Sequence, residues 1–244
     1  MAILKRMKKK KVDSLSFIEH LEELRKRLIF IFVFWFLCSF FTYFFSKDII
    51  KFLTEPLIKY QNKPVFLHPI EPFISVFKIC VFIGGIFSIP FILFQIWLFI
   101  SPGLTEKEKK IIKWIMIGFV FFFCIGSAFA FFILIPFGLK VLFRFGKGTM
   151  VPLISISSYL NFLMIFMIGL GLVFNFPVFT AGLSGLGLVS SEFLIQKRRF
   201  AFIGAFVISA ILTPTTDIFT QIFLAIPLVI LYEISIFFTK IIHK

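Results

Sequence analysis

The sequence predicts an all-α membrane protein with six transmembrane helices and both termini in the cytoplasm. Three observations support this fold class: an apolar composition, six apolar stretches and an uneven distribution of Lys and Arg. Of the 244 residues, 59% are hydrophobic and 16% are charged, and the mean hydropathy is +1.04. A soluble domain usually carries about a quarter charged residues, so the composition indicates a chain that lies mostly in lipid.

The six apolar stretches differ in length. A transmembrane helix needs about 20 predominantly apolar residues, and the first four stretches are long enough to span. The fifth is shorter, and residues 213–217 close it with a turn. The last two stretches therefore predict a tight hairpin that does not fill the bilayer, a mismatch that local thinning can accommodate. The stretches cover residues 28–45, 74–99, 111–139, 160–183, 200–212 and 218–238.

Lys and Arg lie mainly on one side of the predicted membrane domain. Eighteen of them precede the first stretch, follow the second or fourth, or end the chain, whereas seven follow the first or third. Cytoplasmic segments carry the excess of Lys and Arg in membrane proteins, so both termini are predicted to be cytoplasmic. Residues 1–27 then form a basic amphipathic cytoplasmic segment, and residues 28–239 form the six-helix region of a single membrane domain.

Residue patterns that enzymes need are absent from the sequence. It contains no GxSxG, no phosphate-binding GxxxxGK[ST] and no CxxC, and no His lies at metal-binding spacing from an acid within a span. Cys38, Cys80 and Cys124 lie in apolar stretches and are interpreted as small buried hydrophobic residues. The sequence therefore predicts no catalytic residue, metal or cofactor. Its basic residues lie at segment ends, which does not indicate nucleic-acid binding.

Residues 16–27 predict an amphipathic helix that leads into the first span, because apolar side chains recur there at three- and four-residue steps. Ser16 and Glu19 have the spacing of a capping box, which favours a helix that starts at Ser16. The simplest interpretation of the acidic residues in this helix is pairing with Lys26 and Arg27 at helical spacing.

A second polar motif follows the second span. Residues 101–103 end that span, and Thr105 with Glu108 has the spacing of an N-cap and its capping-box partner. This local interpretation accounts for Glu108 completely. A functional role for Glu108 therefore needs independent support.

Glu233 and Asn175 are polar residues at predicted membrane depth. Glu233 lies in the sixth span, where a carboxylate is costly and is by default a functional candidate. Alternatively, it lies near enough to the cytoplasmic end to reach the interface. Asn175 lies two residues before Pro177, which frees a carbonyl of the preceding helix turn. Its side-chain amide either bonds that carbonyl or has a functional role, and the sequence supports the two interpretations equally. A proton-coupled small-solute transporter using Glu233 is the alternative function.

The predicted outer segments are rich in Pro and apolar residues. Residues 46–73 contain four prolines, among them Pro56, and residues 140–159 contain Pro152. Such a composition is not that of a disordered linker. It predicts short helices or caps packed over the membrane.

Six short motifs along the chain resemble, in the same order, those of the TatC family, the large subunit of the twin-arginine translocase. Each motif is weak alone, but six in the same order with the expected topology are specific. They are residues 20–27, 55–57, 99–104 with Glu108, 174–177, 212–217 and 225–233.

The resemblance implies a concave six-helix receptor whose cytoplasmic face binds the twin-arginine motif of signal peptides. It assigns the acidic groups to Glu23 and Glu108, with Leu21, Arg25 and Phe99 lining the site. Carboxylates suit this task, because the planar guanidinium fork of Arg matches them and Lys lacks it.

The resemblance also implies single-span TatA- and TatB-type partners docked along the fifth and sixth spans, self-association, and transport of folded precursors driven by the proton-motive force. It makes Asn175, Asp217, Gln221 and Glu233 intramembrane polar or partner-contact residues, and Pro56 part of the outer cap. The family commonly has Glu or Gln where Asn175 stands, and Asn cannot ionise. The implied location is a bacterial inner membrane, or an organelle membrane if the gene is organellar.

Overall fold

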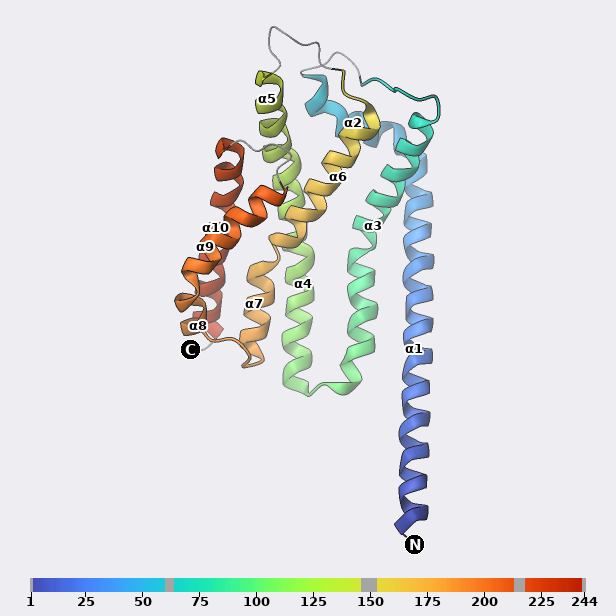
Figure 1. Cartoon of the computed structure of the whole chain (residues 1–244). Coiled ribbons are helices and arrows are strands. Elements are labelled where there is room, and N and C mark those ends of the chain that lie inside the picture. Colours follow the sequence, from blue (N-terminus) through green and yellow to red (C-terminus); the bar gives the residue numbers. More distant parts are fainter. Residues whose placement is uncertain (1, 60–63, 146–152, 213–217, 243–244) are drawn as a thin grey trace.

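The computed structural model describes residues 2–59, 64–145, 153–212 and 218–242, and this part of the chain is almost wholly helical (Figure 1). The all-α prediction is therefore confirmed. Five helical segments among the described residues are long and apolar enough to cross a membrane. They are Glu19–Phe44, Glu71–Gly103, Glu106–Arg144, Ile156–Gly185 and Gln221–Ile241.

Helix α1 (Ala2–Phe44) is a single helix of 43 residues that joins the basic N-terminal segment to the first span. The expectation that a helix starts at Ser16 is wrong, because the helix already runs through that residue. No Gly or Pro interrupts residues 2–44, and Lys, Leu, Met and Arg are good helix formers. Local propensity therefore outweighs the capping preference of Ser16.

The outer segment after α1 folds as a packed cap, as predicted. Helix α2 (Ser46–Ile58) lies across the end of the helical bundle (Figure 1) and buries Leu53, Pro56 and Leu57. The second span, α3 (Glu71–Ile100), returns toward the cytoplasm and ends in a short 3-10 turn, Ser101–Gly103.

The third span has an irregular turn in its middle. It consists of α4 (Glu106–Phe129), a π-helical turn (Ala130–Leu134) and α5 (Ile135–Phe145). Pro136 lies two residues after the end of this wide turn. Because proline has no N–H and its ring clashes with the carbonyl four residues earlier, the widened turn lets the helix continue past it.

The fourth span is broken once, before Pro177. Helix α6 (Ile156–Val173) and α7 (Phe176–Gly185) make up this span. The last part of the chain forms α8 (Ser191–Gln196), α9 (Arg198–Leu212) and α10 (Ile218–Ile242). With 15 residues, α9 is shorter than the roughly 20 that a span needs, in agreement with the short fifth stretch in the sequence.

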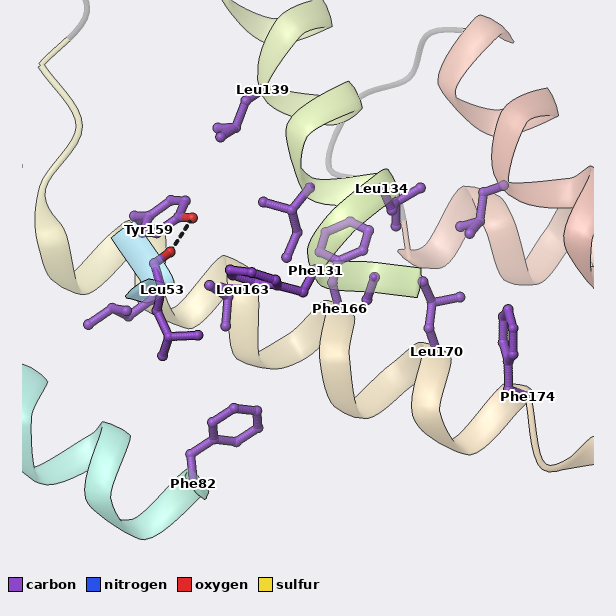
Figure 2. Packing of buried hydrophobic residues seen from close by; sticks show 14 of the residues in the cluster. Leu53, Phe82, Phe131, Leu134, Leu139, Tyr159, Leu163, Phe166, Leu170 and Phe174 are labelled. Atoms are coloured by element: carbon purple, nitrogen blue, oxygen red, sulfur yellow. Dashed lines mark hydrogen bonds between the residues drawn. The ribbon is translucent and has the colours of Figure 1, made fainter. Parts of the chain in front are cut away.

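The core lies where α2, the π-helical turn and α6 meet (Figure 2). Tyr159 is 2% exposed, and its hydroxyl donates a 2.8 Å hydrogen bond to the carbonyl oxygen of Leu53. Gly171 lets α4 and α6 approach closely, since a Cβ there would lie 2.7 Å from a ring carbon of Phe123. Small residues allow such close packing of membrane helices.

Both ends of the chain lie at the same end of the bundle (Figure 1), as an even number of spans requires. The turn between α3 and α4 lies at that end too, while α2 lies at the opposite end. The distribution of Lys and Arg assigns the first end to the cytoplasm. The chain is a multi-pass membrane protein.

Candidate functional site

Glu23 is bonded to a guanidinium group at the cytoplasmic end of α1. The Nε atom of Arg27 donates a 3.0 Å hydrogen bond to Glu23 Oε1, and the Nη2 atom of Arg27 contacts the same oxygen. The Glu23 side chain is 38% exposed and that of Arg27 is 19% exposed. This is the helical i,i+4 pair expected from the sequence.

Arg27 also ties this pair to α3, which the sequence did not predict. Its Nη1 atom donates to Gln95 Oε1 at 3.4 Å, and its Nη2 atom donates to the carbonyl oxygen of Leu98 at 3.3 Å. Gln95 is buried. A lone amide residue in the second apolar stretch, four residues before Phe99, was the only sign of this contact.

Phe99 lies beside Glu23 through an intervening histidine. The rings of His20 and Phe99 are stacked, with centroids 4.3 Å apart and planes 18° apart. The Nδ1 atom of His20 is 3.9 Å from Glu23 Oε2. The structure therefore brings two of the predicted site residues together from α1 and α3. Leu21 and Arg25 are exposed on α1 near this cluster.

Glu108 lies in the first turn of α4, where it completes a capping box. Its Oε2 atom accepts hydrogen bonds from the Thr105 backbone N–H at 2.8 Å and the Thr105 hydroxyl at 2.9 Å. In return, the Thr105 hydroxyl oxygen accepts from the Glu108 N–H at 3.4 Å. The local interpretation of Thr105 and Glu108 is confirmed. Both side-chain bonds use one oxygen, so Oε1 has no hydrogen-bond partner among the described residues.

The two acidic residues share one end of the molecule. Glu23 is tied to the last turns of α3, and only the 3-10 turn and Leu104–Thr105 separate α3 from the helix that carries Glu108. Figure 1 shows α1 and the α3–α4 turn together at the end where the chain begins and ends. We call the cluster of His20, Glu23, Arg27, Phe99 and Glu108 the cytoplasmic rim.

Asn175 has a structural role at the break between α6 and α7. The backbone N–H of Asn175 bonds to the Leu172 carbonyl at 3.1 Å, so the Gly171 carbonyl loses its usual helical donor. The Asn175 amide nitrogen replaces that donor at 2.7 Å. The residue is fully buried, and its Oδ1 atom has no hydrogen-bond partner among the described residues. In this conformation Asn175 presents no surface to a partner.

Glu233 is paired near the cytoplasmic ends of the last helices. Its Oε2 atom lies 2.7 Å from Nη2 of Arg198, the first residue of α9, and both side chains are almost half exposed. On the preceding residue, the Tyr232 hydroxyl donates to the Leu194 carbonyl at 2.6 Å. These contacts fit the interface interpretation of Glu233. Because the carboxylate already has Arg198 as its partner, this pair weighs against the solute-transporter alternative.

Gln221 links the last two helices, whereas Asp217 lies outside the described residues. The Gln221 amide donates a 3.1 Å hydrogen bond to the Phe206 carbonyl of α9. Beside this bond is a surface hollow of about 640 Å³. It is lined by Phe202, Ile203, Phe206, Val207, Ala210, Ile211 and Gln221.

A buried carboxylate at the opposite end of the molecule was not predicted. Glu71, the first residue of α3, accepts hydrogen bonds from the backbone N–H groups of Leu67 at 2.7 Å, His68 at 3.4 Å and Ser157 at 3.0 Å. It therefore joins the segment before α3 to the first turn of α6. Within the described part of the chain, no group of three His, Cys, Asp or Glu is placed to hold a metal ion.

The fold defines the class: a multi-pass helical membrane protein with charged side chains clustered at its cytoplasmic end. Residues 19–227 match the family model described as "Sec-independent protein translocase protein (TatC)". The chain belongs to the TatC family. Members of this family are translocase components, so the chain is a transport component and not an enzyme.

Similar proteins cover nearly the whole chain. The TatC of Carboxydothermus hydrogenoformans is 37% identical over 228 residues, which are 93% of this chain and 94% of that protein. The TatC of Aquifex aeolicus is 36% identical over 227 residues, 91% of this chain and 94% of that protein. A tatC-like protein of Porphyra purpurea, ycf43, is 35% identical over 94% of this chain and 90% of its own length.

The fold is also similar to a solved structure. A crystal structure of the twin-arginine translocase receptor TatC superimposes with a TM-score of 0.75 and 34% sequence identity. The match covers 92% of this chain and all of that chain. The described helices therefore have the arrangement of that receptor.

Proposed function

We propose that the cytoplasmic rim is the signal-peptide receptor site of a twin-arginine translocase. In this proposal the carboxylates of Glu23 and Glu108 bind the two guanidinium groups of the signal peptide, and Leu21, Arg25 and Phe99 line the site. The protein then acts as the receptor subunit that exports folded precursors, driven by the proton-motive force, from the cytoplasmic face of a bacterial inner membrane.

The observation that carries the proposal is the guanidinium already bound to Glu23. Arg27 bonds this carboxylate through Nε and Nη2. The Glu23 carboxylate therefore lies where a guanidinium group can donate two hydrogen bonds to it. Since the Glu23 side chain is 38% exposed, an incoming guanidinium can reach it. Glu108 supports the same role, because Thr105 orients one of its oxygens and leaves the other without a described partner.

The environment of these carboxylates accounts for a preference for Arg over Lys. Guanidinium groups form several directed hydrogen bonds in one plane and stack on aromatic rings, whereas an ammonium is a strongly hydrated point charge. The rim offers the Glu23 carboxylate beside the stacked rings of His20 and Phe99. A twin-lysine peptide can satisfy the charge but not the planar contacts.

The test is binding of a twin-arginine signal peptide to the full-length protein in nanodiscs. Glu23→Gln and Glu108→Gln each remove one charged acceptor while keeping the shape of the side chain. A hydrogen bond to a charged group contributes about 1.5–3 kcal/mol, so each variant should bind roughly 10- to 150-fold more weakly. Peptide titration by fluorescence anisotropy measures the change.

Glu106→Gln is the matched control, because Glu106 lies two residues from Glu108 and its side chain is 89% exposed. It should bind the peptide within about twofold of the parent, as exposed ion pairs contribute little. Unchanged binding by Glu23→Gln, Glu108→Gln and the double variant would refute the site assignment.

Belonging to the TatC family implies a complex with other Tat components, and we propose where single-span TatA- and TatB-type partners dock. The hollow on α9 and α10 has an apolar lining and one amide, that of Gln221. Apolar packing with an occasional polar side chain is how membrane helices associate. Self-association of the chain stays a prediction.

A further inference from the structure

Lys78 is a positive charge inside the second span. It lies on α3, seven residues from Glu71, and is partly buried. Its ammonium donates to Asn161 Oδ1 at 3.0 Å and to the Ser157 hydroxyl at 3.5 Å, both on α6. A charged residue at membrane depth is costly and defaults to a functional interpretation.

The charge of Lys78 is held in place but is not neutralised. Of the ion pairs formed by the described residues, none includes Lys78. Glu71, the only acidic residue of α3, is already bonded to three backbone N–H groups. Asn161 and Ser157 are neutral. Among the described residues, no carboxylate pairs with Lys78.

An apolar groove of about 540 Å³ begins at Lys78. Its walls come from α1, α3, α4 and α6, and its only polar side chains besides the Trp35 indole are those of Lys78 and Asn161. The Trp35 indole N–H is bonded to the Val81 carbonyl at 2.9 Å, which fixes this wall. Farther along the groove the lining includes Ile89, Ile92, Met164 and Ile168.

The polar end of the groove lies within the outer leaflet of a bilayer. With a rise of 1.5 Å per residue, Lys78 lies about 10 Å from the outer end of α3, and the lining from Lys78 to Ile92 spans roughly 20 Å. The acyl chains of one leaflet occupy about 15 Å, half of the hydrocarbon core. The polar end faces the outer leaflet and the apolar end reaches past mid-bilayer.

We propose that this groove binds one anionic phospholipid of the outer leaflet. Its phosphate accepts hydrogen bonds from the Lys78 ammonium and from the amide nitrogen of Asn161, whose oxygen is already bonded to Lys78. One acyl chain lies in the groove against Val81, Ile89 and Met164. The lipid provides the missing anion at Lys78 and covers apolar side chains between α1 and α6.

The distribution of polar side chains favours a lipid over a peptide helix. A lipid has one phosphate at the end of its apolar chains, and the lining has Lys78 and Asn161 at one end and apolar side chains beyond them. A single flexible chain adapts to the irregular walls.

The test measures lipid retention by the full-length protein with native mass spectrometry. The protein is equilibrated in mixed micelles with equimolar dioleoyl phosphatidylglycerol and dioleoyl phosphatidylcholine. Both lipids have the phosphate, but choline neutralises it internally. The parent protein should retain phosphatidylglycerol at least about fivefold better, the effect of one Lys near an anionic headgroup.

Variants separate the headgroup contact from the acyl contact. Lys78→Gln should lose the preference for phosphatidylglycerol, and Lys78→Arg should keep it. Ile89→Trp fills the groove and should reduce retention of both lipids. Lys140→Gln is the control, since Lys140 is exposed at the outer end of α5, away from the groove, and should behave as the parent. Size-exclusion profiles check that each variant is folded.

Three results would overturn the proposal. The first is that the parent protein shows no preference for phosphatidylglycerol, and the second is that Lys78→Gln keeps the preference of the parent. The third comes from a photoreactive residue at Met164 in native membranes: crosslinks to protein alone, with no lipid adduct, would assign the groove to a peptide.

Discussion

At the scale of residues, the Glu23 carboxylate of the cytoplasmic rim is bonded to Arg27. The same carboxylate is the group that we propose binds an arginine of the signal peptide. Arg27 occupies the Glu23 carboxylate and at the same time bonds the Leu98 carbonyl and Gln95 on α3. Both partners are partly exposed, and exposed ion pairs contribute at most about 1 kcal/mol. An incoming guanidinium can therefore displace Arg27 at little cost.

This exchange predicts an effect of Arg27→Gln on peptide binding. Removing the internal competitor should strengthen binding of a twin-arginine peptide by up to about fivefold, the equivalent of 1 kcal/mol. The same titration in nanodiscs measures it. Binding weakened as strongly as by Glu23→Gln would mean instead that Arg27 positions the carboxylate. Lys26→Gln is the control, because Lys26 is exposed on the same helix turn.

At the scale of elements, the α9–α10 hairpin differs from the other spans. The 15 residues of α9 extend about 22 Å, less than the roughly 30 Å of hydrocarbon in a bilayer. In Figure 1 the hairpin ends short of α3 and α5 on the outer side. Gln221 and Arg198 join its two helices at either end. A short helix locally thins the bilayer, which gives partner helices a distinct place to pack.

The partner proposal is tested by filling the hollow of this hairpin. Ala210→Trp places an indole in the space lined by Phe206 and Gln221 and should reduce copurification of TatA- and TatB-type proteins by about tenfold, a loss of roughly 1.4 kcal/mol. Peptide binding at the rim should be unchanged. Quantitative immunoblotting of affinity-purified complexes measures the ratio.

Ala128→Trp is the matched substitution, since Ala128 is exposed on α4 away from the hairpin. It should leave copurification as in the parent. Equal losses in both variants would show that the hollow is not the docking site.

At the scale of the whole molecule, the outer cap joins helices that are far apart in the chain. Glu71 bonds the segment before α3 to Ser157 of α6, the Val65 carbonyl accepts from the Ile156 N–H at 2.8 Å, and Tyr159 bonds the Leu53 carbonyl of α2. These contacts hold α2, the start of α3 and the start of α6 together. The cytoplasmic rim includes the opposite end of α3.

Glu71→Gln should therefore destabilise the whole fold. An amide has one acceptor oxygen and presents its NH₂ group to a backbone donor, so at least one buried N–H loses its partner. The expected loss is about 2–3 kcal/mol, seen as a lower apparent melting temperature in detergent. Glu55→Gln, on the exposed side of α2, is the control. Identical melting of both variants would contradict the role of Glu71.

Much of the fold could be predicted from the sequence, because lipid restricts the chain to helices of a set length. Apolar stretches, Pro positions and the Lys and Arg distribution predicted the long spans, the short α9 and the common side of both termini. The start of α1 was not predicted correctly. Capping residues influence where a helix starts, but the strong helix formers before Ser16 outweigh them.

The site was predictable only in part. The motif resemblance named Glu23, Phe99 and Glu108, and the capping box of Thr105 and Glu108 followed from local spacing. Gln95, Glu71 and Lys78 each bond a partner that lies 68 to 86 residues away in the chain. No periodic pattern encodes such pairs.

The sequence by itself determined that this protein is an all-α membrane protein with its basic side in the cytoplasm, because those properties depend on composition and local order. The tertiary structure alone decided which polar groups of distant helices meet. It placed Arg27 of α1 against Leu98 of α3, and Lys78 of α3 against Asn161 of α6. The physical reason is that a polar group in lipid must find a partner, and packing of distant helices decides which one is near.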